Sequence, residues 1–357
     1  MEFIPRIGIT TGDINGIGPE VLLKALNTHR VNKICIPVIY GSGKHLSKYK
    51  NLVGMQNWQY THVQDATQAQ QKNFNLVNCL KGEYFELTPG KLDPKAGQLA
   101  FDSLARATED LKAGRIDALV TAPISKENIQ SESFKFPGHT EYLAQAFDKK
   151  DVLMFMISDM LRIGVVTGHI PLDKVKKVLT REAIASKLNL MLHSLKVDFG
   201  IAKPKIAVLG LNPHAGENGL LGDEEKQVIS PVIEQYKNKG HLVSGPFPTD
   251  GFFASDHFRK FDAILGMYHD QALTPFKMLA FDSGVNFTAG IPGVRTSPDH
   301  GTGFDIAGQN LADPGSMLHA IYAAVDISRQ RQEYAELDKN SIKHQKIDID
   351  NLKKEKY

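Results

Sequence analysis

The chain has 357 residues, 42% of them hydrophobic and 23% charged, and its 42 Lys and Arg residues nearly balance 40 Asp and Glu residues. The formal charge of +2 excludes a nucleic-acid binder that works through bulk positive charge, and the apolar content excludes a disordered chain. The length predicts about two domains, which can bury a core without disulfides or a structural metal.

Cysteine usage and the N-terminus predict a cytoplasmic protein that does not bind membranes. Cys35 and Cys79 are the only cysteines, and their spacing outside a C-x-x-C pattern is typical of a reducing compartment. Residues 1–6 carry an acid and a proline where a signal peptide would have basic residues and an apolar run. The most apolar stretch, residues 152–157, is far shorter than the roughly 20 residues that span a bilayer.

Short apolar runs alternate with helical patterns, which predicts βαβ units, an α/β fold and a mostly parallel sheet. The first strand is expected at residues 7–10, and Pro19 suits the first turn of a helix that ends at Leu26. A later helix contains residues 99–111 and ends at Gly114. Further strands are expected at residues 36–40, 118–121, 152–157, 162–167, 205–211 and 262–268, and further helices at residues 181–195, 222–238 and 315–328.

Two segments lack a clear periodic pattern. Residues 55–78 are polar and rich in Gln and Asn, so we expect a surface excursion there. The last twenty-five residues hold twelve charged side chains and few apolar ones, which predicts a solvated helix or a loose tail.

Polar residues, glycine and proline cluster directly after four of the apolar runs, and each cluster contains a histidine. In open α/β sheets, ligands bind at the carboxyl ends of the strands. These four segments are therefore the candidate site. They are residues 167–171, 210–217, 266–271 and 296–303.

Three of these histidines, His169, His214 and His269, form a candidate metal site. Neutral imidazole binds divalent ions near pH 7, and three imidazoles leave coordination positions open for a substrate. A single histidine at the end of a strand more often forms a hydrogen bond with a backbone group, but three histidines in three such segments favour metal binding. No ligand here suggests iron or copper, so the ion would act as a Lewis acid, and zinc, magnesium, manganese and cobalt stay open.

A second candidate site would bind an anion. His139 and Thr140 precede a short helical pattern, where backbone N–H groups can face an anion, although Thr140 is as readily explained as a helix N-cap. Lys277, Asn286 and Arg295 follow in a stretch rich in glycine and proline, and the fork of an arginine binds phosphate or carboxylate.

Glycine-rich segments at residues 12–18 and 301–303 match neither G-x-G-x-x-G nor the P-loop pattern. Any dinucleotide would therefore bind without the usual Rossmann fingerprint. Taken together, the chain resembles the 4-hydroxythreonine-4-phosphate dehydrogenase family of pyridoxal phosphate biosynthesis. The most specific parts of the resemblance are Asn-Pro-His at 212–214 and Tyr-His-Asp-Gln at 268–271. It also rests on residues 9–20, 138–141, 211–217, 267–271 and 295–302.

The resemblance implies a two-lobed, three-layer α/β/α fold like that of isocitrate and isopropylmalate dehydrogenases, with the active site in the interdomain cleft. Residues 1–130 with 303–357 would form the first lobe, and residues 131–302 the second, which would carry most metal and substrate residues. The resemblance further implies a homodimer with the active site at the subunit interface, where one of the three histidines comes from the partner subunit. NAD or NADP and one divalent metal ion would bind at each site.

The resemblance also implies roles for individual residues. Lys277 would act in catalysis, and Asp250, Asp270 and a metal-bound water stay open as the general base. The metal ligands would be His169, His214 and His269. The residues that bind the substrate would be His139, Thr140, Lys277, Asn286 and Arg295. The residues that bind the cofactor would be Asn212, Thr296, Asp299 and Gly301.

The implied reaction is a metal-dependent, NAD(P)-linked oxidation of 4-hydroxythreonine 4-phosphate. The β-keto acid that forms would lose carbon dioxide to give 3-amino-1-hydroxyacetone 1-phosphate. Departures from the usual family pattern, at Ile14, Gly168, Gly251 and Pro298 among others, leave open a related substrate of the 4-phosphothreonate or 4-phosphoerythronate type. The alternative from a different class is a metal-dependent hydrolase or aldolase that uses the same histidines without a dinucleotide.

Overall fold

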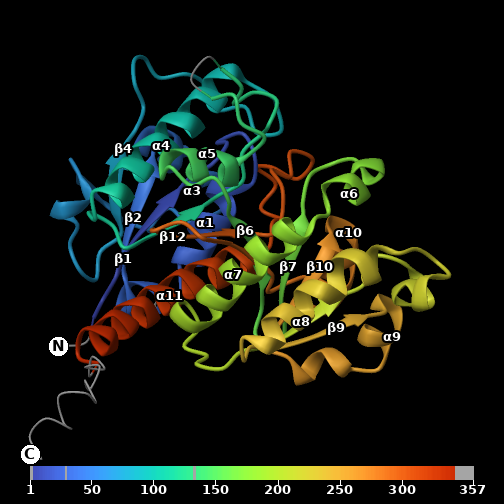
Figure 1. Ribbon diagram of the computed structural model, residues 1–357. Coiled ribbons are helices and arrows are strands. Elements are labelled where there is room, and N and C mark those ends of the chain that lie inside the picture. Colours follow the sequence, from blue (N-terminus) through green and yellow to red (C-terminus); the bar gives the residue numbers. More distant parts are fainter. Residues whose placement is uncertain (1–2, 29, 132–133, 342–357) are drawn as a thin grey trace, which may run out of the picture.

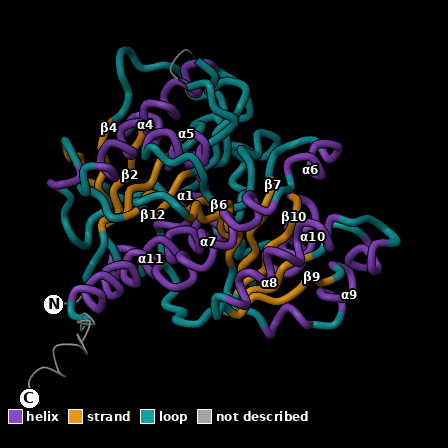
Figure 2. Tube along the Cα trace, in the orientation of Figure 1, coloured by secondary structure: helices purple, strands orange, loops and turns teal. Residues whose placement is uncertain are grey.

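One mixed sheet of twelve strands runs through the described part of the chain, and helices cover both of its faces (Figures 1 and 2). The structure, a computed structural model, describes residues 3–28, 30–131 and 134–341. The predicted α/β class with three layers is therefore confirmed. The strands are β1 (Arg6–Thr10), β2 (Ile36–Gly41), β3 (Thr61–Val63), β4 (Asn75–Asn78), β5 (Ala118–Thr121), β6 (Leu153–Ile157), β7 (Arg162–Thr167), β8 (Lys205–Leu209), β9 (Leu242–Phe247), β10 (Ala263–Tyr268), β11 (Val285–Ala289) and β12 (Val294–Pro298).

The two halves of the sheet run in opposite directions. The strand order is β3-β4-β2-β1-β5-β12-β11-β6-β7-β10-β8-β9. Pairing is parallel from β3 to β12 and again from β7 to β9. At the centre, β11 is antiparallel to β12 and to β6, and β6 is antiparallel to β7. The predicted parallel pairing thus holds within each half, and antiparallel strands join the halves.

The helices form where the sequence supplies caps and an apolar stripe. In the long helix α4, the side chain of Asp93 accepts from the N–H of Lys95 (2.8 Å), Pro94 fills the first turn, and Gly114 at φ 68° follows the end. The helices are α1 (Gly18–Leu26), α2 (Val31–Ile34), α3 (Gly43–Leu52), α4 (Pro94–Lys112), α5 (His139–Ala146), α6 (Leu172–Val178), α7 (Arg181–Val197), α8 (Ser230–Asn238), α9 (Thr249–Ala254), α10 (His269–Ala280) and α11 (Gly315–Lys339).

The apolar core differs between the two faces of the sheet. On one face, α1, α7, α8 and α11 share one continuous core with the strands. On the other face, α4 and α5 cover one core, whereas α9 and α10 cover a second, separate core. Since side chains alternate between the faces of a strand, the central strands β11 and β12 direct every second residue into the space between these two smaller cores.

The expectation for residues 55–78 is only partly right: most of residues 55–74 lie at the surface, but the segment also contains β3 and β4 at one edge of the sheet. The prediction failed because the strands are short and β4 begins with a polar residue, Asn75. Its buried amide donates to the carbonyls of Pro37 and Gln70 (3.1 and 3.0 Å), so a polar residue holds the edge together.

Some other elements differ in extent or were not predicted. The strands β9, β11 and β12 were missed, because Gly245 and Pro246 interrupt the first and polar residues alternate in the other two. The last helix continues beyond residue 328 to Lys339, so the predicted tail begins as helix, and residues 342–357 lie outside the described residues. None of the helices in the described ranges is long and apolar enough to cross a membrane.

Candidate active site

Arg295 is a buried cation at the centre of the sheet. Its neighbours Val294 and Thr296 face the continuous core, so Arg295 faces the space between the two smaller cores. The guanidinium donates to Thr121 Oγ1 (2.7 Å) and Thr288 Oγ1 (3.1 Å), and no carboxylate pairs with it among the described residues. The residue is 3% exposed, and burial lowers its pKa to about 10, although the charge of Glu141 opposes that shift. A buried guanidinium without an ion-pair partner is prepared for an anionic ligand.

Two further polar groups beside Arg295 are buried without hydrogen-bond partners among the described residues. Asn286 lies on β11 two residues before Thr288, hence on the same face, and its Oδ1 is one of these atoms. The other is Nε2 of His139, the first residue of α5. Burial, followed by the charges of Arg295 and Lys126, holds the pKa of His139 well below its usual value. Two predicted substrate residues, His139 and Asn286, thus lie beside a third, the buried cation Arg295.

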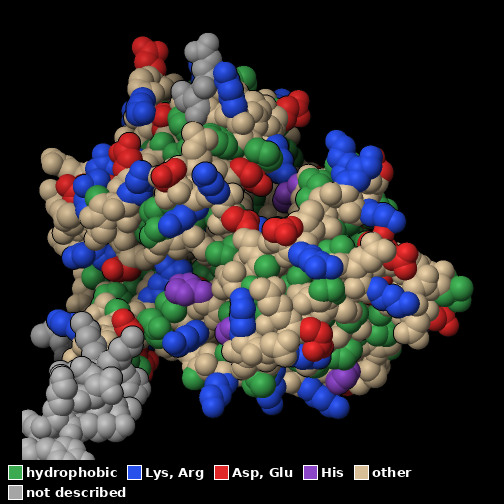
Figure 3. Space-filling model, viewed as in Figure 1, with side chains coloured by type: hydrophobic (Ala, Val, Ile, Leu, Met, Phe, Trp, Pro, Cys, Tyr) green, Lys and Arg blue, Asp and Glu red, His purple; other side chains and the backbone are tan. Residues whose placement is uncertain are grey.

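The N-terminus of α5 leads from this group to a cavity of about 710 Å³. The helix begins at His139 with Gly138 as its N-cap, so the alternative interpretation of Thr140 as the N-cap is wrong. Thr140, Glu141 and His169 line the cavity together. No role was predicted for Glu141, an acid in the first helical turn. Figure 3 shows the molecule hollowed between the part that carries α5 and the part that carries α6, with histidine atoms visible there.

Two of the three predicted metal ligands lie side by side. The ends of β7 and β10 are paired, with Tyr268 opposite Thr167, which brings His169 and His269 to a distance of 5.3 Å between ring centroids. Nδ1 of His269 binds Asp270 Oδ1 (2.7 Å), so its Nε2 is free to ligate an ion. Burial, followed by the charges of Lys126 and His269, lowers the pKa of His169, which favours the neutral ring that a metal requires.

The third predicted ligand, His214, does not complete this pair within one chain. No group of three His, Cys, Asp or Glu side chains in the described ranges could hold a metal ion. His214 is exposed, and residues 214–218 all have positive φ, between 40° and 78°. Such backbone is costly outside glycine and is typical of functional loops. Glu225 fixes the loop by accepting from the N–H (2.8 Å) and the amide (2.9 Å) of Asn212.

Lys277 and Asp299, predicted for substrate and cofactor respectively, form an ion pair at 3.3 Å. The N–H of Asp299 donates to Ser316 Oγ (3.0 Å), which ties the loop after β12 to α11. Burial raises the pKa of Asp299, although Lys277 opposes that shift. Gly301 is exposed two residues further along this loop. Thr296, also predicted for the cofactor, is fully buried and donates to the carbonyl of Ala320 in α11 (2.8 Å).

The two candidate bases are exposed, and an unpredicted glutamine lies between their loops. Asp250 is in the first turn of α9, and Asp270 binds the imidazole next to it. The amide of Gln271 donates to the carbonyl of Gly210 (2.5 Å) and to Thr249 Oγ1 (2.9 Å). Gln271 therefore joins the ends of β8, β9 and β10. The sequence marked Gln271 as part of a specific motif but gave it no role.

Acid is expected to destabilise the fold through His139. Its folded pKa lies below the unfolded value of about 6.5, so between these two values only the unfolded chain binds the proton and stability rises with pH. Unfolding free energies in denaturant should thus fall as pH drops below 6.5, and less steeply in His139→Gln. Because burial also lowers the pKa of His45 and His169, the decisive comparison is His139→Gln against the exposed His241→Gln. Equal slopes in both variants would contradict this assignment.

Comparison with known proteins decides the family. The family described as "Pyridoxal phosphate biosynthetic protein PdxA" matches residues 33–324. The chain belongs to the PdxA family. The family predicted from the sequence is thereby confirmed.

Individual relatives agree with this assignment. A 4-hydroxythreonine-4-phosphate dehydrogenase of Bacteroides thetaiotaomicron is 45% identical over 98% of this chain and 96% of the relative. A D-threonate 4-phosphate dehydrogenase of Cupriavidus necator is 39% identical over 92% of this chain and 99% of the relative.

Solved structures of the PdxA family share the fold. The crystal structure of 4-hydroxythreonine-4-phosphate dehydrogenase from Klebsiella pneumoniae superimposes with a TM-score of 0.81 at 34% identity, over 92% of this chain and 99% of that chain. Isocitrate dehydrogenase from Methylococcus capsulatus superimposes with a TM-score of 0.50 at 13% identity, over 94% and 89%. The predicted relation to the isocitrate dehydrogenase fold is therefore confirmed.

Proposed function

We propose that the chain is an NAD(P)-dependent dehydrogenase that oxidises 4-hydroxythreonine 4-phosphate in pyridoxal phosphate biosynthesis. The carbinol hydride passes to the nicotinamide ring, the hydroxyl proton is released, and the resulting β-keto acid loses carbon dioxide to give 3-amino-1-hydroxyacetone 1-phosphate. The observation that carries this proposal is Arg295, a buried cation without an ion-pair partner among the described residues. It stands in a chain that also brings His169 and His269 together and is 45% identical to a relative of that name. The dehydrogenase relatives also disfavour the hydrolase or aldolase alternative.

The anionic ends of the substrate would bind around Arg295. Its guanidinium offers several hydrogen bonds to a phosphate or carboxylate, Thr140 adds a hydroxyl, and Nε2 of His139 can donate when it carries the proton. The free Oδ1 of Asn286 would instead accept from the hydroxyl or the amino group of the substrate. Lys277 is half-exposed at the edge of this region and adds a second cation. Holding both charged ends fixes the carbinol between them, which accelerates the reaction by orientation.

The donor set also suits a divalent ion. His169 and His269 are adjacent, and Asp270 orients the second ring, which fits a site completed by His214 of the partner subunit. The ion would supply Lewis-acid polarisation of the substrate hydroxyl. Asp250 and Asp270 are exposed carboxylates that can accept the hydroxyl proton, and within the described ranges neither forms an ion pair with a lysine or an arginine, although Asp270 also binds His269.

The nicotinamide cofactor would bind on the loops after β8 and β12. Asn212, Asp299 and Gly301 lie there, and Thr296 would act indirectly, by anchoring β12 on α11. We place the reaction between the two predicted lobes, residues 1–130 with 303–357 and residues 131–302. The two separate cores on one face of the sheet support this division. Two buried free thiols, Cys35 and Cys79, support the cytoplasm as the compartment.

The proposed substrate is tested by nicotinamide reduction. Purified protein with a divalent ion and NAD or NADP should raise absorbance at the reduced cofactor's band when 4-hydroxythreonine 4-phosphate is added. D-threonate 4-phosphate is the matched alternative, since a relative with that name is 39% identical. We expect at least tenfold higher kcat/KM for the first compound. The opposite ranking would assign the chain to the threonate branch, and no reduction with either would reject the dehydrogenase.

A homodimer is supported by an apolar surface at the end of α10, next to Lys277. Met278 is 81% exposed and Phe281 is 76% exposed, and large apolar side chains of this kind are typical of interfaces. Phe281→Asp should therefore convert the protein from dimer to monomer in light scattering and lower activity at least tenfold. The control is Leu52→Asp, an exposed apolar residue on α3, which should leave the mass unchanged. A wild-type monomer would contradict the proposal.

A further inference from the structure

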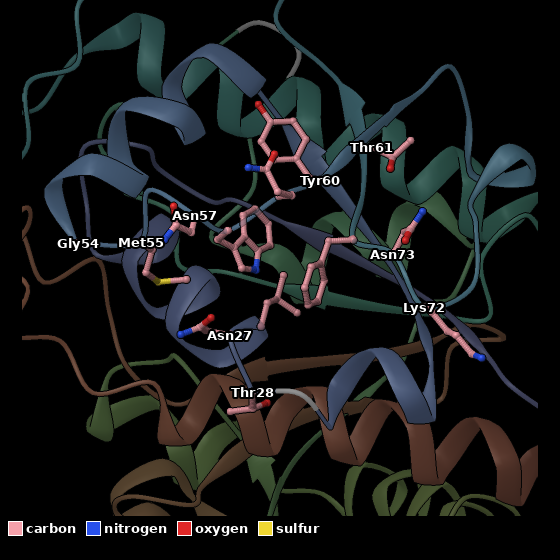
Figure 4. A pocket seen from close by; sticks show the side chains of 13 residues that line it. Asn27, Thr28, Gly54, Met55, Asn57, Tyr60, Thr61, Lys72 and Asn73 are labelled. Atoms are coloured by element: carbon pink, nitrogen blue, oxygen red, sulfur yellow. The ribbon is translucent and has the colours of Figure 1, made fainter.

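A second pocket lies beside β3 and β4, at the outer edge of the sheet's first half. It has a volume of about 540 Å³ and is bounded by the C-terminal end of α1, the segment that leads into β3 and the segment just before β4. None of its lining residues is acidic, and the one lysine, Lys72, points away from the centre (Figure 4). The pocket therefore suits a ligand without a positive charge.

Trp58, the only tryptophan of the chain, lines this pocket. Its ring stacks on Phe74 at 4.9 Å and lies 5.8 Å from Tyr60, between ring centroids. The residue is 7% exposed, and its indole N–H is buried without a hydrogen-bond partner among the described residues. A buried donor without an acceptor costs free energy that a bound acceptor would recover.

The other walls combine fixed and free polar groups. The hydroxyl of Tyr60 is held by Gly43 O (3.0 Å) and Ser47 Oγ (2.9 Å), so its ring is a rigid wall. The side-chain amides of Asn27 and Asn57 are exposed and make no hydrogen bond within the described chain, so they can donate and accept. Asn27 also caps α1, where the last backbone carbonyls of a helix are free to accept.

We propose that this pocket binds an uncharged, planar heteroaromatic small molecule whose ring edge accepts a hydrogen bond from Trp58. The aromatic walls favour a flat ring, the buried indole N–H requires an acceptor on that ring, and the amides match further donors and acceptors. Purines and pyridines share this chemistry. The site does not depend on the proposed dehydrogenase activity.

The pocket is separate from the candidate active site. β3 is the outermost strand of its half, and five strand spacings of about 4.8 Å, or roughly 24 Å, separate it from β12, which carries Arg295. Yet α1 connects the two regions, because the N–H of Ile17, just before α1, donates to Thr302 O (2.8 Å) in the predicted cofactor loop, while Leu26 at its other end lines the pocket.

The test uses the single indole N–H signal of the full-length protein in a ¹H–¹⁵N spectrum. Nicotinamide, adenine and pyridine are titrated separately, and benzene is the matched control, since it has the shape of pyridine without an acceptor. At least one heteroaromatic probe should shift the indole signal saturably, and benzene should not. Asn57→Leu should weaken that binding at least fivefold, whereas Gln56→Leu, an exposed neighbour outside the lining, should not.

Trp58→Phe keeps an aromatic ring but removes the donor, and calorimetry should then show at least tenfold weaker binding of the same probe. A linear, non-saturating shift with every probe would overturn the proposal. The proposal would also be overturned if none of the three heteroaromatic probes shifted the indole signal, because a water molecule would then satisfy the indole N–H and no probe would displace it. Neither result would bear on the nicotinamide-reduction assay, so the two proposals fail separately.

Discussion

Arg295→Lys is expected to lower kcat/KM for 4-hydroxythreonine 4-phosphate by about 100-fold, with the larger part of the loss in KM. Lysine keeps the charge but loses the planar fork that Thr121 and Thr288 hold in place. Two charge-assisted hydrogen bonds worth about 1.5 kcal/mol each correspond to roughly a hundredfold. Steady-state kinetics with purified variants measures the effect.

The fold itself should not depend on this arginine. Burying a guanidinium without a carboxylate is unfavourable, and Arg295 is 3% exposed. Arg295→Met should therefore keep the melting temperature close to the wild-type value while removing activity. Arg259→Lys, an exposed arginine on the surface, is the matched control and should change neither property. Activity of Arg295→Lys within threefold of wild type would remove Arg295 from the substrate site.

The sequence predicted the frame of the fold because most elements carry their own local signals. Strands such as β1 and β10 are continuous apolar runs, and α4 has an aspartate cap, a proline in its first turn and a glycine after its end. The strands β11 and β12 lack such a signal, since one side of each carries the polar residues around Arg295. Asn286 and Arg295 interrupt the apolar pattern there, so two of the residues that were predicted to bind the substrate concealed the strands.

The candidate site could be predicted as a set of residues but not as an arrangement. Histidines after strand ends indicated a metal, and the pairing of β7 with β10 does bring His169 and His269 together. That Arg295 has no ion-pair partner among the described residues, however, depends on which strands meet at the centre of the sheet. Likewise, Gln271 forms hydrogen bonds with Gly210 and Thr249, which are distant in sequence, and no local sequence pattern indicates such contacts.

His214→Ala and His169→Ala should each lose the bound metal, and the activity of each variant should fall to about a thousandth of wild type or less. The reason is that each substitution removes one of the three proposed ligands. Both side chains are exposed, and Ala215 already adopts φ 50°, so alanine at position 214 should preserve the fold. Metal content by elemental analysis and circular dichroism check these two expectations. Full metal retention in His214→Ala would reject the three-histidine site.

Mixing the two variants tests where His214 acts. If a site combines His169 and His269 of one subunit with His214 of the partner subunit, a mixed dimer contains one site with all three histidines intact. Random reassortment of equal amounts makes half of the dimers mixed, so activity and metal content should recover to about a quarter of wild type. If all three ligands came from the same chain, every site would lack a histidine and no recovery would occur. The single-chain geometry, with two adjacent histidines and the third on a rigid exposed loop, favours recovery.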